Sequence, residues 1–168
     1  MLCDGVAIAG TPVDFVKGAG RRYRSVLMTP RLSLEPLRLD HARDMASVLI
    51  DPALYEHIGG SPPAEAELEG QYARQTRGVS PDGRQGWLNW ALRLRGERRL
   101  IGVVQATLGE RDATVGAELA WMVARQEQGA GLATEAACAV TGWLQTVGVT
   151  ALSAHIHPRN AASAAVAR

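Results

Sequence analysis

The sequence predicts one mixed α+β domain, in which a central and mostly antiparallel sheet is flanked by helices. Three alternating apolar segments follow one another between short polar turns, a pattern typical of an antiparallel meander. The segments before and after them repeat their apolar residues at helical spacing. A length of 168 residues, of which 46% are hydrophobic, suits one domain with a sizeable core. No repeat or internal linker indicates a second domain.

The chain before the meander predicts one strand and two helices. Apolar residues alternate in RLSLEPL, residues 31–37, which favours a strand. The pattern becomes helical after Asp40, a good N-cap residue, and continues to Leu49. Ser61, followed by two prolines, indicates the start of a second and more solvated helix, which we expect to end at about Arg77.

The meander consists of three strands after a loop at residues 77–86. WLNWALRL (87–94) and RLIGVVQATL (99–108) are separated by the polar sequence RGER and predict a hairpin. TVGAELAWMV (114–123) adds a third strand after the polar turn GERDA. Because both connections are short, neighbouring strands are expected to be antiparallel.

A long helix, a strand and a short helix are expected after the meander. The apolar stripe of the long helix comprises Leu132, Ala136, Val140, Trp143, Leu144 and Val147. ALSAHIH (151–157) then predicts a final strand. Asn160 is a suitable N-cap for a last helix that runs toward Arg168.

Composition argues against several classes of function. The net charge is +1 and no basic run exceeds residues 21–24, so there is no electrostatic footprint for nucleic acid or an anionic membrane. Cys3 and Cys138 lie far apart without CxxC or Cys/His spacing, which argues against a disulfide framework and a zinc site. A reducing, cytoplasmic location is therefore expected.

Residues 1–27 are expected to be an extension, not necessarily ordered, before a domain at residues 28–168. The segment has no basic n-region and no apolar run of signal or membrane length. The regular pattern begins only beside Met28. One explanation is translation from a start codon upstream of the true one.

The segment QEQGAGLA, residues 126–133, places two glycines between the third meander strand and the long helix. The first amides of a helix have no intrahelical partner, and the helix dipole favours an anion there by about 0.3 to 1 kcal/mol. Gly129 and Gly131 lack a Cβ, so a phosphate can approach the backbone closely. The loop therefore suits a pyrophosphate, although glycines here can also serve only to turn the chain. A Walker loop needs GK[ST], which is absent, and a dinucleotide fingerprint needs Gly or Ala where Thr134 stands.

Four segments resemble the GNAT superfamily of N-acetyltransferases. QGAGLA, residues 128–133, matches the family's acetyl-CoA loop pattern R/Q-x-x-G-x-G/A. Residues 126–131 also fit, but the later register places apolar Leu132 at the inner position and leads directly into the helix. TPRLSLEPL, VGAELAWMV, GLATEA and HPRNAAS occur in the family's order over residues 29–168. They are similar to the branch that includes ribosomal-protein-alanine N-acetyltransferases.

The resemblance implies a three-layer fold in which the strand before the loop splays from its neighbour. The pantetheine arm of acetyl-CoA would lie in this gap, bound by the main chain of Trp121, Met122 and Val123, whose side chains also suit a core. The loop implied to hold the diphosphate comprises Gln128, Gly129, Ala130, Gly131, Leu132, Ala133 and Thr134. Asn160 matches a family asparagine that contacts the CoA arm, and this role is compatible with an N-cap. No metal is implied.

Transfer of an acetyl group to an amine requires the neutral amine. A lysine-like amine, with a pKa of about 10.4, costs roughly 4 to 5 kcal/mol to deprotonate at pH 7, whereas an α-amino group costs only about 1 to 1.4 kcal/mol. An enzyme for protein amino termini could therefore manage with a weak base. The acceptor that we expect is a protein amino terminus or a small amine. Glu118, on the strand that leads to the loop, is the candidate base, and a solvated strand carboxylate is the alternative. Ser163 matches a serine that the branch is thought to place near the departing sulfur, and reinforcing the cap is its alternative role.

Other polar and aromatic residues have structural interpretations that are at least as good. His155 and His157 alternate on the expected final strand and so share a face, but no third ligand completes a metal site. Trp87 and Trp90 on the first meander strand could touch an acceptor, although core packing is the simpler interpretation. Cys138 needs no special role.

The resemblance also implies two further strands after the last helix, and these are absent from the sequence. The strand at ALSAHIH should then expose an unpaired edge, which favours association, for example as a homodimer. A truncated reading frame, completion by a partner chain and replacement by residues 1–27 remain as explanations. The absence also leaves a second function open, a non-catalytic CoA-binding or protein-interaction module.

Overall fold

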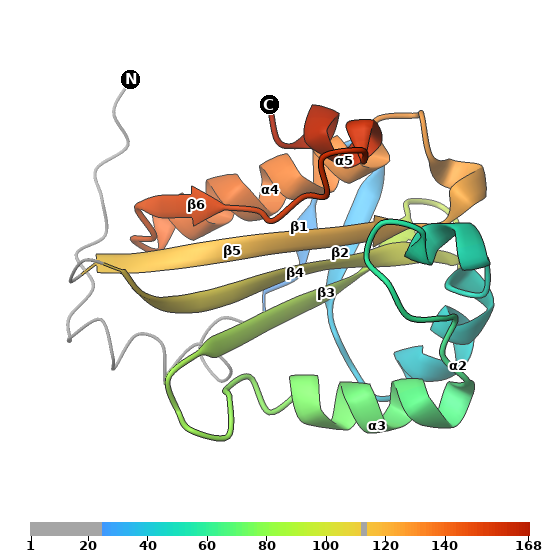
Figure 1. Cartoon of the computed structure of the whole chain (residues 1–168), viewed down its shortest axis with the longest axis horizontal. Coiled ribbons are helices and arrows are strands. Elements are labelled where there is room, and N and C mark those ends of the chain that lie inside the picture. Colours follow the sequence, from blue (N-terminus) through green and yellow to red (C-terminus); the bar gives the residue numbers. More distant parts are fainter. Residues whose placement is uncertain (1–24, 112–113) are drawn as a thin grey trace.

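The computed structural model describes residues 25–111 and 114–168. In this part of the chain, six strands form one sheet in the order β1-β2-β3-β4-β5-β6 (Figure 1). The strands are β1 Leu27–Met28, β2 Leu32–Pro36, β3 Gly86–Leu94, β4 Leu100–Arg111, β5 Thr114–Val123 and β6 Ala151–Ser153. All neighbours are antiparallel except β5 and β6, which are parallel. The expected α+β class and the antiparallel meander β3–β5 are confirmed.

Helices cover both faces of the sheet and make three layers (Figure 1). The α-helices are α2 His41–Val48, α3 Glu65–Gln75, α4 Leu132–Thr146 and α5 Ala161–Val166, and the 3₁₀-helices are η1 Pro52–Tyr55 and η2 Arg125–Glu127. On one face, the apolar stripe of α4 packs on side chains from β2 to β5. On the other face, α2 and α3 form a smaller core with residues of β3 and β4. No helix in the described part of the chain is long and apolar enough to span a bilayer.

Two of the three expected helix starts differ from the prediction, in the capping hydrogen bond or in the first residue. Asp40 is the N-cap of α2, but its side chain makes no capping hydrogen bond and instead accepts from Arg38 Nε at 3.0 Å. The second helix begins at Glu65 and not at Ser61, and the Glu67 carboxylate accepts from the Ala64 amide at 2.7 Å. Asn160 does cap α5, because its Oδ1 accepts from the Ser163 amide at 3.0 Å.

Both edges of the sheet differ from the expectation. Leu27 pairs with Leu34, so the sheet begins one residue before the expected start at Met28, and Trp90 Nε1 donates to the Ser25 carbonyl. β1 adds to the edge opposite β6, and residues 1–24 lie outside the described part of the chain. The expected strand at 151–157 is wrong in length, because β6 ends at Ser153. No described strand pairs with the outer side of β6, and association through this edge stays a prediction.

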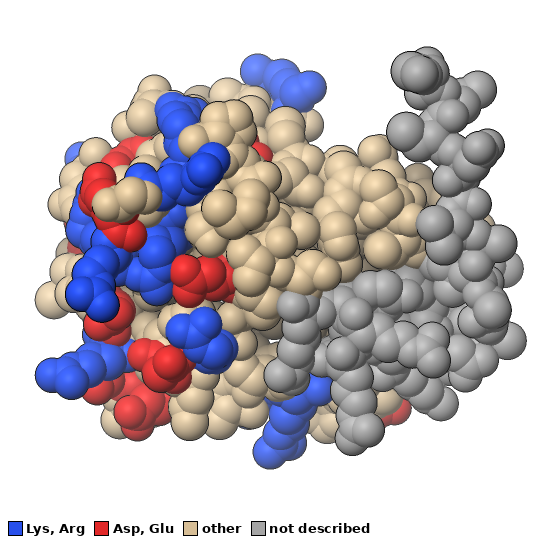
Figure 2. Space-filling view, turned by 180° about the vertical axis from the view of Figure 1, so that it is seen from behind, with Lys and Arg blue, Asp and Glu red and all other residues tan. Residues whose placement is uncertain are grey.

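Charged side chains of both signs lie close together at one end of the visible described surface, and the rest of that surface is largely neutral (Figure 2). Ion pairs in the described part of the chain include Arg99 with Glu127 at 2.6 Å and Arg31 with Glu135 at 2.6 Å. A mixed surface of this kind does not concentrate the potential of one sign.

Candidate active site

The sheet opens where β5 and β6 separate. The two strands pair only from Gly116 with Ala151 to Glu118 with Ser153, and β5 then continues to Val123 without a described partner on that side. Backbone groups of a strand that has lost its neighbour need other hydrogen-bond partners. The gap therefore offers main-chain donors and acceptors along residues 119–123, as the resemblance implies.

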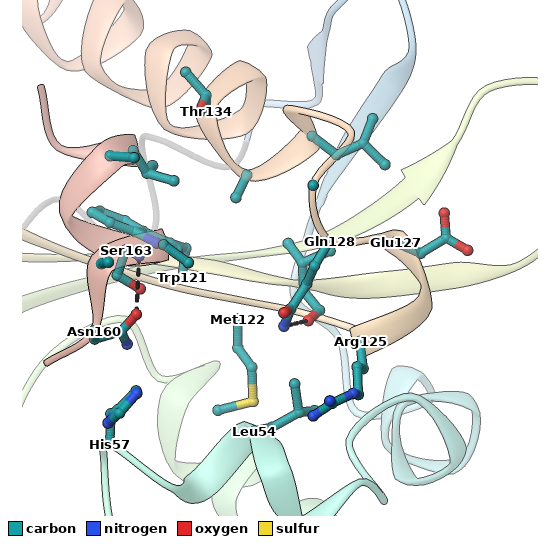
Figure 3. A pocket seen from close by; sticks show the side chains of 18 of the residues that line it. Leu54, His57, Trp121, Met122, Arg125, Glu127, Gln128, Thr134, Asn160 and Ser163 are labelled. Carbon is teal, nitrogen blue, oxygen red and sulfur yellow. Dashed lines mark hydrogen bonds between the residues drawn. The ribbon is translucent and has the colours of Figure 1, made fainter.

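A cavity of about 660 Å³ occupies this opening. Its walls come from the end of β5, the loop into α4, the helix α5 and the segment at η1 (Figure 3). Of the residues proposed above, those that line it are Trp121, Met122, Val123, Gln128, Gly129, Gly131, Leu132, Ala133, Thr134, Asn160 and Ser163. Ala130 and Glu118 do not line the cavity.

The loop into α4 fits an anion. Gly129 has φ 77° and Gly131, the N-cap of α4, has φ 76°, a left-handed conformation in which a side chain is strained. A Cβ added at Gly129 would meet no atom within 4 Å, so this side of the backbone is open. The amides of Leu132, Ala133 and Thr134 form the first turn and have no intrahelical acceptor. These donors and the positive end of the helix dipole would suit the diphosphate of a coenzyme.

The side chain of Gln128 fixes the loop rather than pointing freely into the cavity. Its Nε2 donates to the Val123 carbonyl at 3.0 Å, which ties the loop to the last residue of β5 (Figure 3). The loop is thereby held beside the open strand.

A second set of contacts anchors the same loop from the other end of the chain. The Glu135 carboxylate accepts from Thr29 Oγ1 at 2.6 Å, from the Arg31 amide at 2.9 Å and from Arg31 Nε at 2.6 Å. Arg31 Nη1 also donates to the Ala130 carbonyl at 2.7 Å. We call these four residues the loop clasp. It joins residues about a hundred positions apart, and sequence reasoning missed it.

The clasp favours the ionised form of Glu135. Partial burial by itself would raise the pKa of this carboxyl, but the hydrogen bonds from Thr29 and Arg31 and the charge of Arg31 lower it below its ordinary value. The carboxylate is therefore charged and holds Arg31 beside the loop, where a Cβ added at Gly131 would stand 3.6 Å from the guanidinium.

Glu118 lies outside the cavity, where β5 and β6 separate. Its carboxylate is 2.9 Å from His155 Nδ1, and the His155 side chain is 81% exposed. A carboxylate beside an imidazole can relay a proton to solvent.

The expected pairing of two histidines on one strand face is wrong, because β6 ends before either of them. His155 contacts Glu118, whereas His157 stacks on His57 with ring centroids 5.4 Å apart. His57 lines the cavity, and its Nδ1 is buried without a hydrogen-bond partner among the described residues. Nothing in the local sequence singled out His57.

The two tryptophans of β3 lie on opposite faces. Trp90 is 1% exposed and meets the edge of Trp143 in the α4 core, which confirms the core interpretation for this residue. Trp87 is half-buried on the face toward α3. Cys138 is exposed on α4, and Cys3 lies outside the described part of the chain.

Comparisons with known proteins place the chain in a family. The model of the acetyltransferase (GNAT) domain matches residues 31–168. An acetyltransferase structure from Agrobacterium tumefaciens is 27% identical, with a TM-score of 0.62 over 85% of this chain and 80% of that one. RimL, a ribosomal alpha-N-protein acetyltransferase, is 15% identical, with a TM-score of 0.67 over 86% of this chain and 78% of that one.

A structure of AAC(6')-Ib in complex with paromomycin and acetyl-CoA is 19% identical, with a TM-score of 0.67 over 81% of this chain and 79% of that one. None of the curated proteins matches the sequence. The family match spans most of the chain, including β5, the glycine loop and α5, and the chain therefore belongs to the GNAT acetyltransferases.

Proposed function

We propose that the protein transfers the acetyl group of acetyl-CoA to a primary amine, either the amino terminus of a protein or a small amine, by direct attack. One observation carries the proposal. The unpaired amides of the α4 first turn and the open side of β5 line one cavity of about 660 Å³. The cavity therefore provides amide donors for an anion next to a strand edge that can hydrogen-bond an extended ligand.

Different residues of the chain would bind different parts of acetyl-CoA. The amides of Leu132, Ala133 and Thr134 would hold the diphosphate, and the main chain of residues 121–123 would hold the pantetheine arm. Asn160 keeps its Oδ1 on the Ser163 amide, so its Nδ2 remains to donate to a ligand. Acetyl-CoA supplies an activated acetyl thioester when bound.

Glu118 would take the proton from the attacking amine and pass it through His155 to solvent. Because the amine nitrogen forms a bond to the acetyl carbon while the carbon–sulfur bond breaks, one proton leaves the nitrogen and one is needed by the departing thiolate. Ser163 lines the cavity, and its hydroxyl makes no hydrogen bond with other described residues. This hydroxyl is suited to protonate the sulfur.

Two measurements test the proposal. Titration calorimetry should show that the full chain binds CoA, and the release of free thiol from acetyl-CoA should depend on an added amine. A panel of peptides, polyamines and aminoglycosides would reveal the acceptor. Binding without thiol release for every amine would instead indicate a non-catalytic CoA-binding module, and no binding at millimolar CoA would refute the site itself.

Replacement of Ser163 by alanine should lower kcat by about tenfold, less than the roughly hundredfold of a full general-acid contribution, because the departing thiolate can also take its proton from solvent. The affinity for CoA should change little, because the capping bond uses the backbone amide of residue 163 and remains possible. Ser47→Ala, at an exposed serine of α2 that bonds the Asp44 carbonyl, is the control and should keep full activity. Undiminished turnover in Ser163→Ala would assign the serine to the cap alone.

A further inference from the structure

The face of the sheet that α2 and α3 cover changes character along the strands. Ala91 lies in the core beneath these helices, and the partly buried Val103 and Met122 pack against that core. Further along the same three strands, the residues on this face are Trp87, Asn89, Gln105, Thr107, Ala120 and Glu118, because side chains on one face recur every two residues. An apolar half of the face therefore passes into a polar half.

A recess of about 230 Å³ lies over the polar half, between α3 and the strands β3 and β4. Asn89 and Gln105 are cross-strand partners and form its floor. Gln71 and Gln75, one helical turn apart on α3, form the facing wall. Four carboxamide side chains thus converge on one space.

These carboxamides have unused hydrogen-bonding capacity. The side chains of Gln71, Asn89 and Gln105 make no hydrogen bond with any described residue, and the buried Gln75 Oε1 has no partner among them. A buried acceptor without a partner costs free energy, so it favours a ligand that brings an N–H donor. Each carboxamide can both donate and accept, as a peptide group does.

The recess borders the proposed base. Thr107 lies directly opposite Glu118 across β4 and β5, and Trp87 lies opposite Thr107 across β3 and β4, so the three share one face. Two strand spacings, about 10 Å, separate Glu118 from β3. An extended chain of about three residues covers this distance.

The charge of the recess disfavours a polycation. Among the described residues that line it, Arg74 is the charged one and none carries a carboxylate. Polyamines and other polycationic acceptors would therefore meet like charge there, whereas an acidic side chain in the ligand would be attracted.

We propose that this recess binds the main chain of a peptide acceptor, whose amino terminus then reaches Glu118. The proposal rests on the acetyl-transfer function proposed above and names the acceptor class as a peptide of at least about four residues. The carboxamides hold the peptide groups of residues two to four, and Arg74 favours an acidic side chain among them.

The test compares a short and a long acceptor with the same first residue. For the full chain, kcat/KM should be higher for an acidic tetrapeptide than for the corresponding amino-acid amide. In the double variant Asn89→Leu/Gln105→Met, kcat/KM for the tetrapeptide should fall about tenfold, the effect of losing one or two hydrogen bonds, while the value for the amide stays unchanged. A general structural defect would lower both values. Gln145→Met, at an exposed position of α4 on the opposite face, is the matched control.

A second readout separates this inference from the enzymatic proposal. The tetrapeptide is titrated by calorimetry into the protein saturated with CoA, with and without the double substitution. If the double substitution weakens peptide binding and no thiol is released, the peptide-binding role of the recess stands and the proposed acetyl transfer is refuted. Thiol release with no preference for the tetrapeptide, an equal loss for both acceptors, or a polyamine as the best acceptor would overturn the inference.

Discussion

Replacement of Gly102 by alanine is expected to lower the free energy of unfolding by about 3 kcal/mol, the upper range for overpacking a well-packed site. Gly102 lies on β4 opposite Val123, the last residue of β5. A Cβ at this position would stand 2.1 Å from the Met122 carbonyl oxygen and 2.9 Å from Val123 Cα. Both atoms belong to the backbone, so relief requires the end of β5 to move.

The same change should weaken CoA binding, because Met122 and Val123 line the cavity and Val123 accepts the hydrogen bond that holds Gln128. Gly109→Ala is the matched control on the same strand, since a Cβ there meets no atom within 4 Å. Denaturant unfolding and CoA calorimetry on both variants check the prediction. Equal stability of the two variants would show that β5 tolerates the displacement.

Replacement of Glu135 by alanine should have the second largest effect, on the recognition of the diphosphate. The side chain is only 15% exposed and accepts three hydrogen bonds from Thr29 and Arg31. Without the carboxylate, Arg31 loses the partner that places it against the Ala130 carbonyl. Since hydrogen bonds to charged groups contribute about 1.5 to 3 kcal/mol, we expect CoA affinity to fall at least about tenfold.

Pantetheine separates an effect on diphosphate recognition from a general loosening of the cavity. Pantetheine lacks the diphosphate, so its affinity should be nearly the same for the wild type and for Glu135→Ala, whereas a general loosening of the cavity would weaken both ligands. Arg31→Lys should also lower the affinity for CoA, because a lysine cannot donate from two fixed directions to Glu135 and Ala130. Glu97→Ala, at a half-exposed carboxylate paired with Arg99, is the control. If Glu135→Ala lowers the affinities for CoA and for pantetheine equally, the loop clasp has no specific part in diphosphate recognition.

The loop clasp stabilises the folded state, and the pH dependence of this stabilisation follows from the lowered pKa of Glu135. The unfolded chain binds the proton more readily than the folded one, so the stabilisation is fully present above the ordinary pKa of about 4.5. It is lost as the pH falls through the lowered value. The contribution of the clasp should therefore be constant near neutral pH.

Much of the fold followed from local patterns in the sequence. The strand β5 has the predicted bounds, residues 114–123, and α4 buries Leu132, Ala136, Val140 and Leu144 as its apolar stripe predicts. Gly129 and Gly131 have positive φ, and Asn160 caps α5. Each of these features depends on residues within one or two turns of each other. The roles assigned to Glu118 and Ser163 stay predictions.

The remaining features depend on contacts between distant parts of the chain. The pairing of Leu27, the early end of β6, the loop clasp, the stacking of His57 on His157 and the recess beneath α3 had no local signal.

The sequence by itself determined most of the strands and helices, their order and the glycine loop, because strand and helix periodicity and backbone freedom are properties of neighbouring residues. Only the tertiary structure decided which side chains meet around the cavity and the recess. The physical reason is that a contact such as that of Arg31 with Glu135 exists only after the sheet has brought residues about a hundred positions apart to one place.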